Sequence, residues 1–127
     1  MKNIERLPES ELDIMLTLWH AGEPLTAGEI AKKLSESHGW KTGTVHTLLE
    51  RLGERGFVSC DKSGYKHLFS PTIKESDYRK GEEHTIISRF FGGSAKNMIA
   101  SLLNADGLSD EDLEELSAML RKKAGDK

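Results

Sequence analysis

Residues 40–71, WKTGTVHTLLERLGERGFVSCDKSGYKHLFSP, decide the fold because the spacing of their apolar side chains changes partway along. In the first half these side chains recur at intervals of three and four residues, which is the period of one buried helix face: Val45, Leu48, Leu49 and Leu52. The runs 57–61 and 65–69 that follow have the aromatic and β-branched composition of short strands. Gly64 lies between them in a Lys-Ser-Gly turn, and Pro71 closes the pair. The stretch therefore predicts a helix followed by a β-hairpin.

Two further helices are predicted upstream of this stretch. The first ends at Gly22 and has an apolar face at core spacing, which comprises Leu12, Met15, Leu16 and Trp19. Thr26 and Glu29 form a capping box that starts the second helix. Thr42 or Thr44 is expected to cap the third. Three helices and a hairpin within about 65 residues follow the order of a winged helix-turn-helix domain.

Residues 72–127 are expected to be helical again, in three segments. Their apolar side chains lie at core spacing and comprise Ile86, Ile87, Phe90, Phe91, Ile99, Leu102, Leu103, Leu113, Leu116 and Leu120. Because three short helices offer too few partners to bury these side chains, we expect them to pack against a second copy and form a homodimer. The alternative is that they fold back onto the N-terminal domain. The predicted fold class is mainly α, with a winged helix-turn-helix domain and its two-stranded wing over residues 1–71 and a helical dimerisation domain over residues 72–127.

Composition narrows the class of protein. Of the 127 residues, 31% are charged and the net charge is −3, but residues 37–71 alone carry five basic and three acidic side chains. Cys60 is the only cysteine, which excludes an intrachain disulfide and a CxxC metal site. The N-terminus has no secretory signal, and no apolar run approaches the roughly 20 residues of a membrane span. We therefore expect a cytoplasmic protein that does not associate with membranes.

The third helix and the hairpin carry the side chains that we predict to bind double-stranded DNA. Polar and basic residues near the start of the helix and opposite its apolar stripe are Lys41, Thr42, Thr44, His46, Thr47 and Arg51. A helix that enters the major groove by its N-terminal end brings such donors to base edges and phosphates. The hairpin adds Lys62, Ser63 and Lys66 for backbone phosphates. If the sequence contained only this helix, its polar residues would be explained as the solvent-exposed face of an amphipathic helix. The basic hairpin that follows it favours DNA binding instead.

Several motifs between Leu7 and Leu120 resemble the penicillinase repressor family, which includes the repressors of β-lactamase, methicillin-resistance and copper-transport operons. The most specific is Thr44-Val-x-Thr-Leu-Leu-x-Arg-Leu52 after a Trp, and the others are Leu12-Asp-Ile-Met-Leu-Thr-Leu-Trp19, Thr26-Ala-Gly-Glu-Ile30, Gly56-Phe-Val58, Phe69-Ser-Pro71 and Phe91-Gly-Gly-Ser94. The resemblance implies a homodimeric bacterial transcriptional repressor that binds pseudo-palindromic operator DNA through the third helix and the wing. By position, Thr44, His46, Thr47 and Arg51 match the DNA-facing residues of the family, and His46 stands where an arginine is often found.

The resemblance also bears on how the repressor is released from DNA. Copper-responsive members end in Cys-x-Cys motifs, whereas no cysteine follows Cys60 here, so neither a metal switch of that kind nor any cofactor is predicted. Antibiotic-responsive members are cut by a sensor protease at an Asn-Phe bond in the helix after the Gly-Gly pair. The matching position here is Ser101–Leu102, a different pair, and a cut there would split the expected dimer core.

Two other classes of function fit the sequence less well. An enzyme is disfavoured because the five histidines form no HExxH or His-x-His pattern and the single cysteine has no catalytic context. A winged-helix module that binds protein instead of DNA is the alternative, because the basic excess of residues 37–71 is small and Glu50 and Glu54 flank Arg51. The acidic run of residues 106–115 lacks the spacing of a calcium loop and suits the start of a helix.

Overall fold

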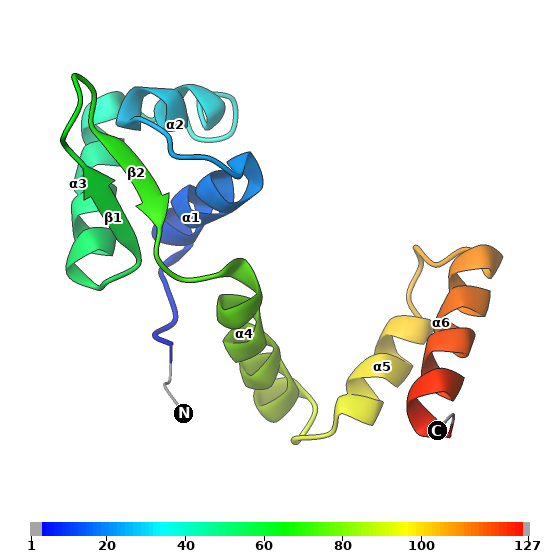
Figure 1. Ribbon diagram of the computed structural model, residues 1–127. Coiled ribbons are helices and arrows are strands. Elements are labelled where there is room, and N and C mark those ends of the chain that lie inside the picture. The colour runs from blue at the N-terminus through cyan, green and yellow to red at the C-terminus, as the bar shows by residue number, and fades with distance from the viewer. Residues whose placement is uncertain (1–3, 126–127) are drawn as a thin grey trace. The chain divides into compact units, whose positions relative to one another are not determined.

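The computed structural model describes residues 4–125 of the chain. This part contains six helices and one two-stranded antiparallel sheet (Figure 1), which confirms the predicted fold class: α1 (Glu9–Ala21), α2 (Ala27–Lys33), α3 (Thr42–Glu54), β1 (Val58–Asp61), β2 (Leu68–Pro71), α4 (Glu75–Phe90), α5 (Ala95–Leu103) and α6 (Asp110–Ala124). Over the described residues, no helix combines the length and apolar character that crossing a membrane requires.

The chain divides into two compact units, and the division falls inside α4, between Glu83 and His84. The start of α4 therefore belongs to the first unit. Tyr78, on this part of α4, is 5% exposed, and its hydroxyl accepts a hydrogen bond from the backbone N–H of Leu7 at 2.9 Å. The indole N–H of Trp19 donates to the carbonyl of Ile73, just before α4, at 2.8 Å. The first bond attaches α4 to the segment that precedes α1, and the second attaches the residues just before α4 to α1 itself.

The core of the first unit forms where α1, α2 and α3 pack on one another and on the hairpin. Its largest fully buried apolar side chains are Ile14, Met15, Leu18, Ile30, Val45, Leu49, Leu52 and Phe57. The segment before α2 pairs with β2 through a single antiparallel bridge, in which Leu25 and Phe69 exchange backbone hydrogen bonds of 3.1 and 2.8 Å. This bridge brings the start of α2 next to the hairpin and α3 (Figure 1).

The buried face of α1 is rotated from the predicted one. The structure buries Glu11, Ile14, Met15 and Leu18, whereas three members of the predicted face, Leu12, Leu16 and Trp19, are only half-buried. Both sets satisfy helical spacing, and Met15 belongs to both, so the periodicity alone does not choose between them. Packing against α2, α3 and β2 selects the face that contains Ile14 and Leu18.

The hairpin is shorter and its loop longer than predicted. Its second strand begins at Leu68, not Tyr65, and continues to Pro71, which pairs with Val58. Tyr65 is 99% exposed in the loop. Asp61 holds the turn at the end of β1, because its carboxylate accepts hydrogen bonds from the backbone N–H of Ser63 at 2.9 Å and from its hydroxyl at 2.6 Å.

Two of the expected helix ends are confirmed, and one is not. The capping box of Thr26 and Glu29 is present, and Gly22 follows the end of α1. Ser94 and Ser109 cap α5 and α6. The third helix, in contrast, has Lys41 at its N-cap position and no side-chain cap. The expectation that Thr42 or Thr44 caps it was wrong, because both lie within the first helical turn and Lys41 alone has the extended backbone of a cap.

The second unit leaves its apolar side chains largely at the surface, and no residue of α5 or α6 is buried. Among the residues predicted to form a dimer interface, Phe90, Leu102 and Leu120 are 74%, 55% and 51% exposed. The remaining members of that set are exposed (Ile86, Ile99, Leu103 and Leu113) or half-buried (Ile87, Phe91 and Leu116). Their burial in a dimer stays a prediction.

Candidate nucleic-acid interface

The solvent face of α3 collects the helix residues that the sequence predicts to meet DNA. Val45, Leu48, Leu49 and Leu52 are buried, as their spacing predicts, and hold the opposite side of the helix against the core. The predicted contact residues Lys41, Thr42, Thr44, His46, Thr47 and Arg51 are all exposed. The Thr47 hydroxyl donates to the carbonyl of Gly43 at 3.1 Å, so in the free protein this hydroxyl is turned toward its own helix.

The start of α3 is held in place by a cluster in the turn that precedes it. His38 Nε2 lies 2.7 Å from Asp13 Oδ2 on α1, and about a quarter of each side chain is exposed. The imidazole also stacks on the indole of Trp40, with ring centroids 4.1 Å apart and an angle of 10° between the planes. Gly39, which separates the two residues in the sequence, has a φ of 66°, a backbone conformation that glycine adopts without a steric penalty. These contacts connect the segment that leads into Lys41 to α1.

The end of α3 is fixed by a second cluster. Arg55, the C-cap residue, donates from Nη1 to Oε1 of Glu11 at 2.8 Å. Glu11 is buried, and Arg55 is also 3.9 Å from Glu5. The helix is therefore attached to α1 by side-chain contacts at both ends, while its middle packs on the core. These contacts hold the exposed face of α3 in one orientation relative to α1.

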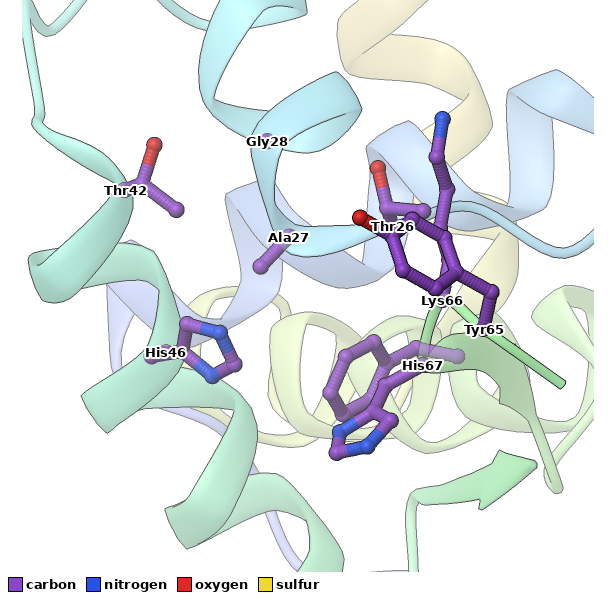
Figure 2. Close-up of a pocket in the computed structure, with 9 residues that line it drawn as sticks. Thr26, Ala27, Gly28, Thr42, His46, Tyr65, Lys66 and His67 are labelled. Atoms are coloured by element: carbon purple, nitrogen blue, oxygen red, sulfur yellow. The ribbon is translucent and has the colours of Figure 1, made fainter. Parts of the chain in front are cut away.

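A hollow lies on this side of the molecule between α2, α3 and the hairpin loop (Figure 2). It is lined by Thr26, Ala27, Gly28, Thr42, His46, Tyr65, Lys66, His67 and Phe69. A neighbouring hollow is lined partly by Glu50, Cys60 and Lys62, and it shares His46, His67 and Phe69 with the first. The His46 ring meets the Phe69 ring edge to face, with centroids 6.1 Å apart. The helix face and the hairpin thus form one continuous surface.

The hairpin supplies charge to this surface, although its predicted residues differ in availability. Lys62 and Lys66 are exposed. Both donors of Ser63 are used by Asp61 in the free protein, and these hydrogen bonds lower the pKa of the Asp61 carboxyl. The pKa of Glu29 is lowered mainly by its hydrogen bonds with Thr26, and Lys66 lowers it further through its charge. The positive charge of Lys66 in the hairpin loop therefore acts on the carboxylate of Glu29 on α2.

Two residues of the surface were not predicted from the sequence. Thr26 lines the first hollow, and Arg55 anchors the end of α3. The capping-box pattern identifies Thr26 only as a helix start, and the Arg55–Glu11 pair joins residues 44 positions apart, which no local pattern encodes. Cys60 is half-buried and pairs with Phe69 across the sheet. In the described part of the chain, no cluster of three or more His, Cys, Asp or Glu residues could hold a metal ion.

This architecture and this polar face define a winged helix-turn-helix DNA-binding protein. A family model described as penicillinase repressor matches residues 7–122. The penicillinase repressor of Bacillus licheniformis is 32% identical over 122 residues, which cover 96% of this chain and 94% of the relative. The methicillin resistance regulatory protein MecI of Staphylococcus aureus is 23% identical over 117 residues, or 92% of this chain and 94% of MecI.

A solved structure agrees with these relatives. The solution structure of the monomeric form of Bacillus licheniformis BlaI in complex with the blaP half-operator is similar to this chain with a TM-score of 0.52 and 33% identity, covering 61% of this chain and 94% of that one. The chain therefore belongs to the penicillinase repressor family, which confirms the resemblance found in its motifs. That family consists of transcriptional repressors and not of enzymes.

Proposed function

We propose that the protein is a cytoplasmic repressor that binds a pseudo-palindromic operator as a homodimer, through α3 and the hairpin. The observation that carries this proposal is the exposed polar face of α3, which is held by side-chain contacts at both ends and borders the basic hairpin loop. The BlaI structure described above supports it, because that relative is bound to a half-operator. We transfer DNA binding to the matching face of this chain.

On this proposal α3 enters the major groove by its N-terminal end. Lys41, Thr42 and His46 would then meet phosphates beside the groove, and Thr44 and Arg51 would face base edges. Lys62 and Lys66 would neutralise phosphates on the flanking backbone, the position that a wing occupies beside its recognition helix. The two clusters at the ends of α3 would keep this geometry preformed, so little ordering of the helix would accompany binding.

The second unit is proposed to form the dimer. Apolar side chains as large as Phe90 and Leu102 lie more than half exposed, and a second copy of the same surface could cover them. A two-fold dimer would place two copies of α3 on successive major grooves about 34–36 Å apart, or a multiple of that spacing. The operator should then be a pseudo-palindrome.

Release from DNA is proposed to follow from a cut in α5 by a sensor protease. Ser101 and Leu102 are exposed in that helix, and Leu102 belongs to the proposed dimer surface. A cut at this bond would separate part of that surface from the DNA-binding unit and so weaken operator binding. Incubation with the sensor protease of the same operon should yield one discrete fragment ending at Ser101, and an intact chain would rule out this mode of release.

DNA binding is tested by selecting duplexes from a randomised library with the full-length chain and measuring affinity for the enriched sequence. Arg51→Ala should weaken binding by about 1–3 kcal/mol, because a side chain that contacts a base edge contributes that much. The matched control is Arg79→Ala, since Arg79 lies on α4 and pairs with Glu75 and Glu83 of its own helix. If no duplex is enriched and none is bound, the module binds protein instead.

A further inference from the structure

His46 and His67 come from different elements and face the same two hollows. His46 lies on α3, and His67 lies in the loop just before β2. Both residues line both hollows. Figure 2 places the His46 ring on the α3 side of the first hollow and the His67 ring on the hairpin side. Both residues are exposed, so both imidazoles are accessible from solvent.

The residues of the first hollow suit an anion, whereas those of the second are of mixed charge. The first hollow is also lined by Lys66, Thr26 and Thr42, which carry one ammonium and two hydroxyl groups. The second adds Lys62 together with two acidic groups, the Glu50 carboxyl and the Cys60 thiol.

Glu29 and Glu50 carry carboxylates near these rings, and the described residues show no ion pair between either carboxylate and His46 or His67. Glu29, which Lys66 influences from α2, is held by its hydrogen bonds with Thr26. Within residues 4–125, the histidines that form ion pairs are His20, with Glu75, and His38, with Asp13. In the free protein, therefore, no carboxylate lies within ion-pair distance of His46 or His67 in the described residues.

We propose that His46 and His67, together with Lys66, form a phosphate site for the operator backbone, and that binding there takes up a proton. This inference rests on the proposed function, because the DNA supplies the phosphate. A phosphodiester is negatively charged throughout the neutral range, and an adjacent negative charge favours the protonated form of imidazole. Imidazole changes its charge between about pH 5 and 8. By linkage, operator affinity must then fall as the pH rises from 6 to 8.

The test measures the affinity of the full-length chain for its selected duplex at pH 6, 7 and 8 and constant salt, by fluorescence anisotropy. An uptake that averages about half a proton between pH 6 and pH 8 predicts a dissociation constant roughly tenfold higher at pH 8 than at pH 6. The double variant H46Q/H67Q keeps hydrogen-bonding side chains but cannot be charged, so its affinity should be nearly independent of pH. The matched control is H20Q, which should retain the pH dependence of the wild type, because His20 lies at the end of α1 beside Glu75.

A second measurement does not depend on how any variant folds. Calorimetry of wild-type binding at pH 7 in two buffers with different ionisation enthalpies counts the protons taken up, and an uptake clearly above zero is expected. The inference is overturned if the wild type binds the selected duplex without proton uptake, or if folded H46Q/H67Q keeps the full pH dependence. Failure of the proposed function would look different, because no duplex would then bind even at pH 6.

Discussion

Arg55 Nη1 lies 2.8 Å from Glu11 Oε1, and Glu11 is 2% exposed. This pair joins the end of α3 to the first turn of α1. A buried carboxylate is tolerated when a cation and hydrogen bonds replace its lost hydration. The orientation of the exposed α3 face therefore depends on a contact inside the protein.

Replacing Arg55 with methionine should lower the free energy of unfolding by about 3 kcal/mol, because Glu11 would stay buried without its partner. The midpoint of urea denaturation should move to a lower concentration at an unchanged slope. Arg79→Met is the control, because the Arg79 side chain is 59% exposed in its pairs with Glu75 and Glu83. Such exposed pairs contribute less than about 1 kcal/mol. Equal effects of the two substitutions would contradict this interpretation.

A fragment that ends at Glu83 should fold by itself, and one that ends at Pro71 should be much less stable. We propose Glu83 as the end of the DNA-binding unit, because the shorter fragment lacks Tyr78 and Ile73, which bond to Leu7 and Trp19. Truncating a buried aromatic side chain costs about 3–5 kcal/mol. Thermal melts followed by circular dichroism would compare the fragments, and melts at the same temperature would restore residue 71 as the boundary.

Stability should fall at alkaline pH through Tyr78. Burial, followed by the nearby Glu82, raises the pKa of Tyr78 above its usual 10.0. The folded state thus holds the phenol proton more tightly than the unfolded state, so this contribution is complete below pH 10 and is lost as the pH rises through the folded-state pKa.

Tyr78→Phe removes this titration, so its urea midpoint should fall less steeply than that of the wild type above pH 10. The variant should already be about 1 kcal/mol less stable at neutral pH, because the Leu7 N–H loses its acceptor. Tyr65→Phe serves as the control, since Tyr65 is 99% exposed, and its curve should follow the wild type. Parallel curves for Tyr78→Phe and the wild type would exclude this role of Tyr78.

Leu102→Glu should convert the proposed dimer into a monomer and weaken operator binding, because a carboxylate would have to be buried in the apolar interface. Sedimentation velocity reports whether the variant has the mass of a monomer or of a dimer. The fragment that ends at Glu83 lacks the interface, so its thermal melt shows whether the DNA-binding unit folds without it. Asn97→Glu, at an exposed position of the same helix, should remain dimeric. A wild-type chain that sediments as a monomer at micromolar concentration would contradict the dimer.

Features encoded over short distances could be predicted from the sequence. The stripe from Val45 to Leu52 follows from helical spacing, and the capping box at Thr26 follows from local hydrogen bonds. These features place the exposed face of α3 correctly, and the family motifs lie mostly on the same elements.

Features that depend on tertiary packing could not be predicted in this way. The burial of Glu11 depends on Arg55, which reaches it from α3 across 44 positions of the sequence. The start of β2 at Leu68 depends on which residues pair with β1 and with Leu25. The hollow that contains His67 exists only because those pairings bring the hairpin loop beside α2 and α3.

The salt dependence of affinity for the selected duplex tests the central claim most directly, namely that α3 and the hairpin bind DNA through its phosphates. The logarithm of the association constant should fall linearly with the logarithm of salt concentration, with a slope of about −0.9 for each phosphate neutralised. Lys41→Ala should make the slope shallower by about one such unit. A slope near zero, or a slope that Lys41→Ala leaves unchanged along with the affinity, would contradict the claim.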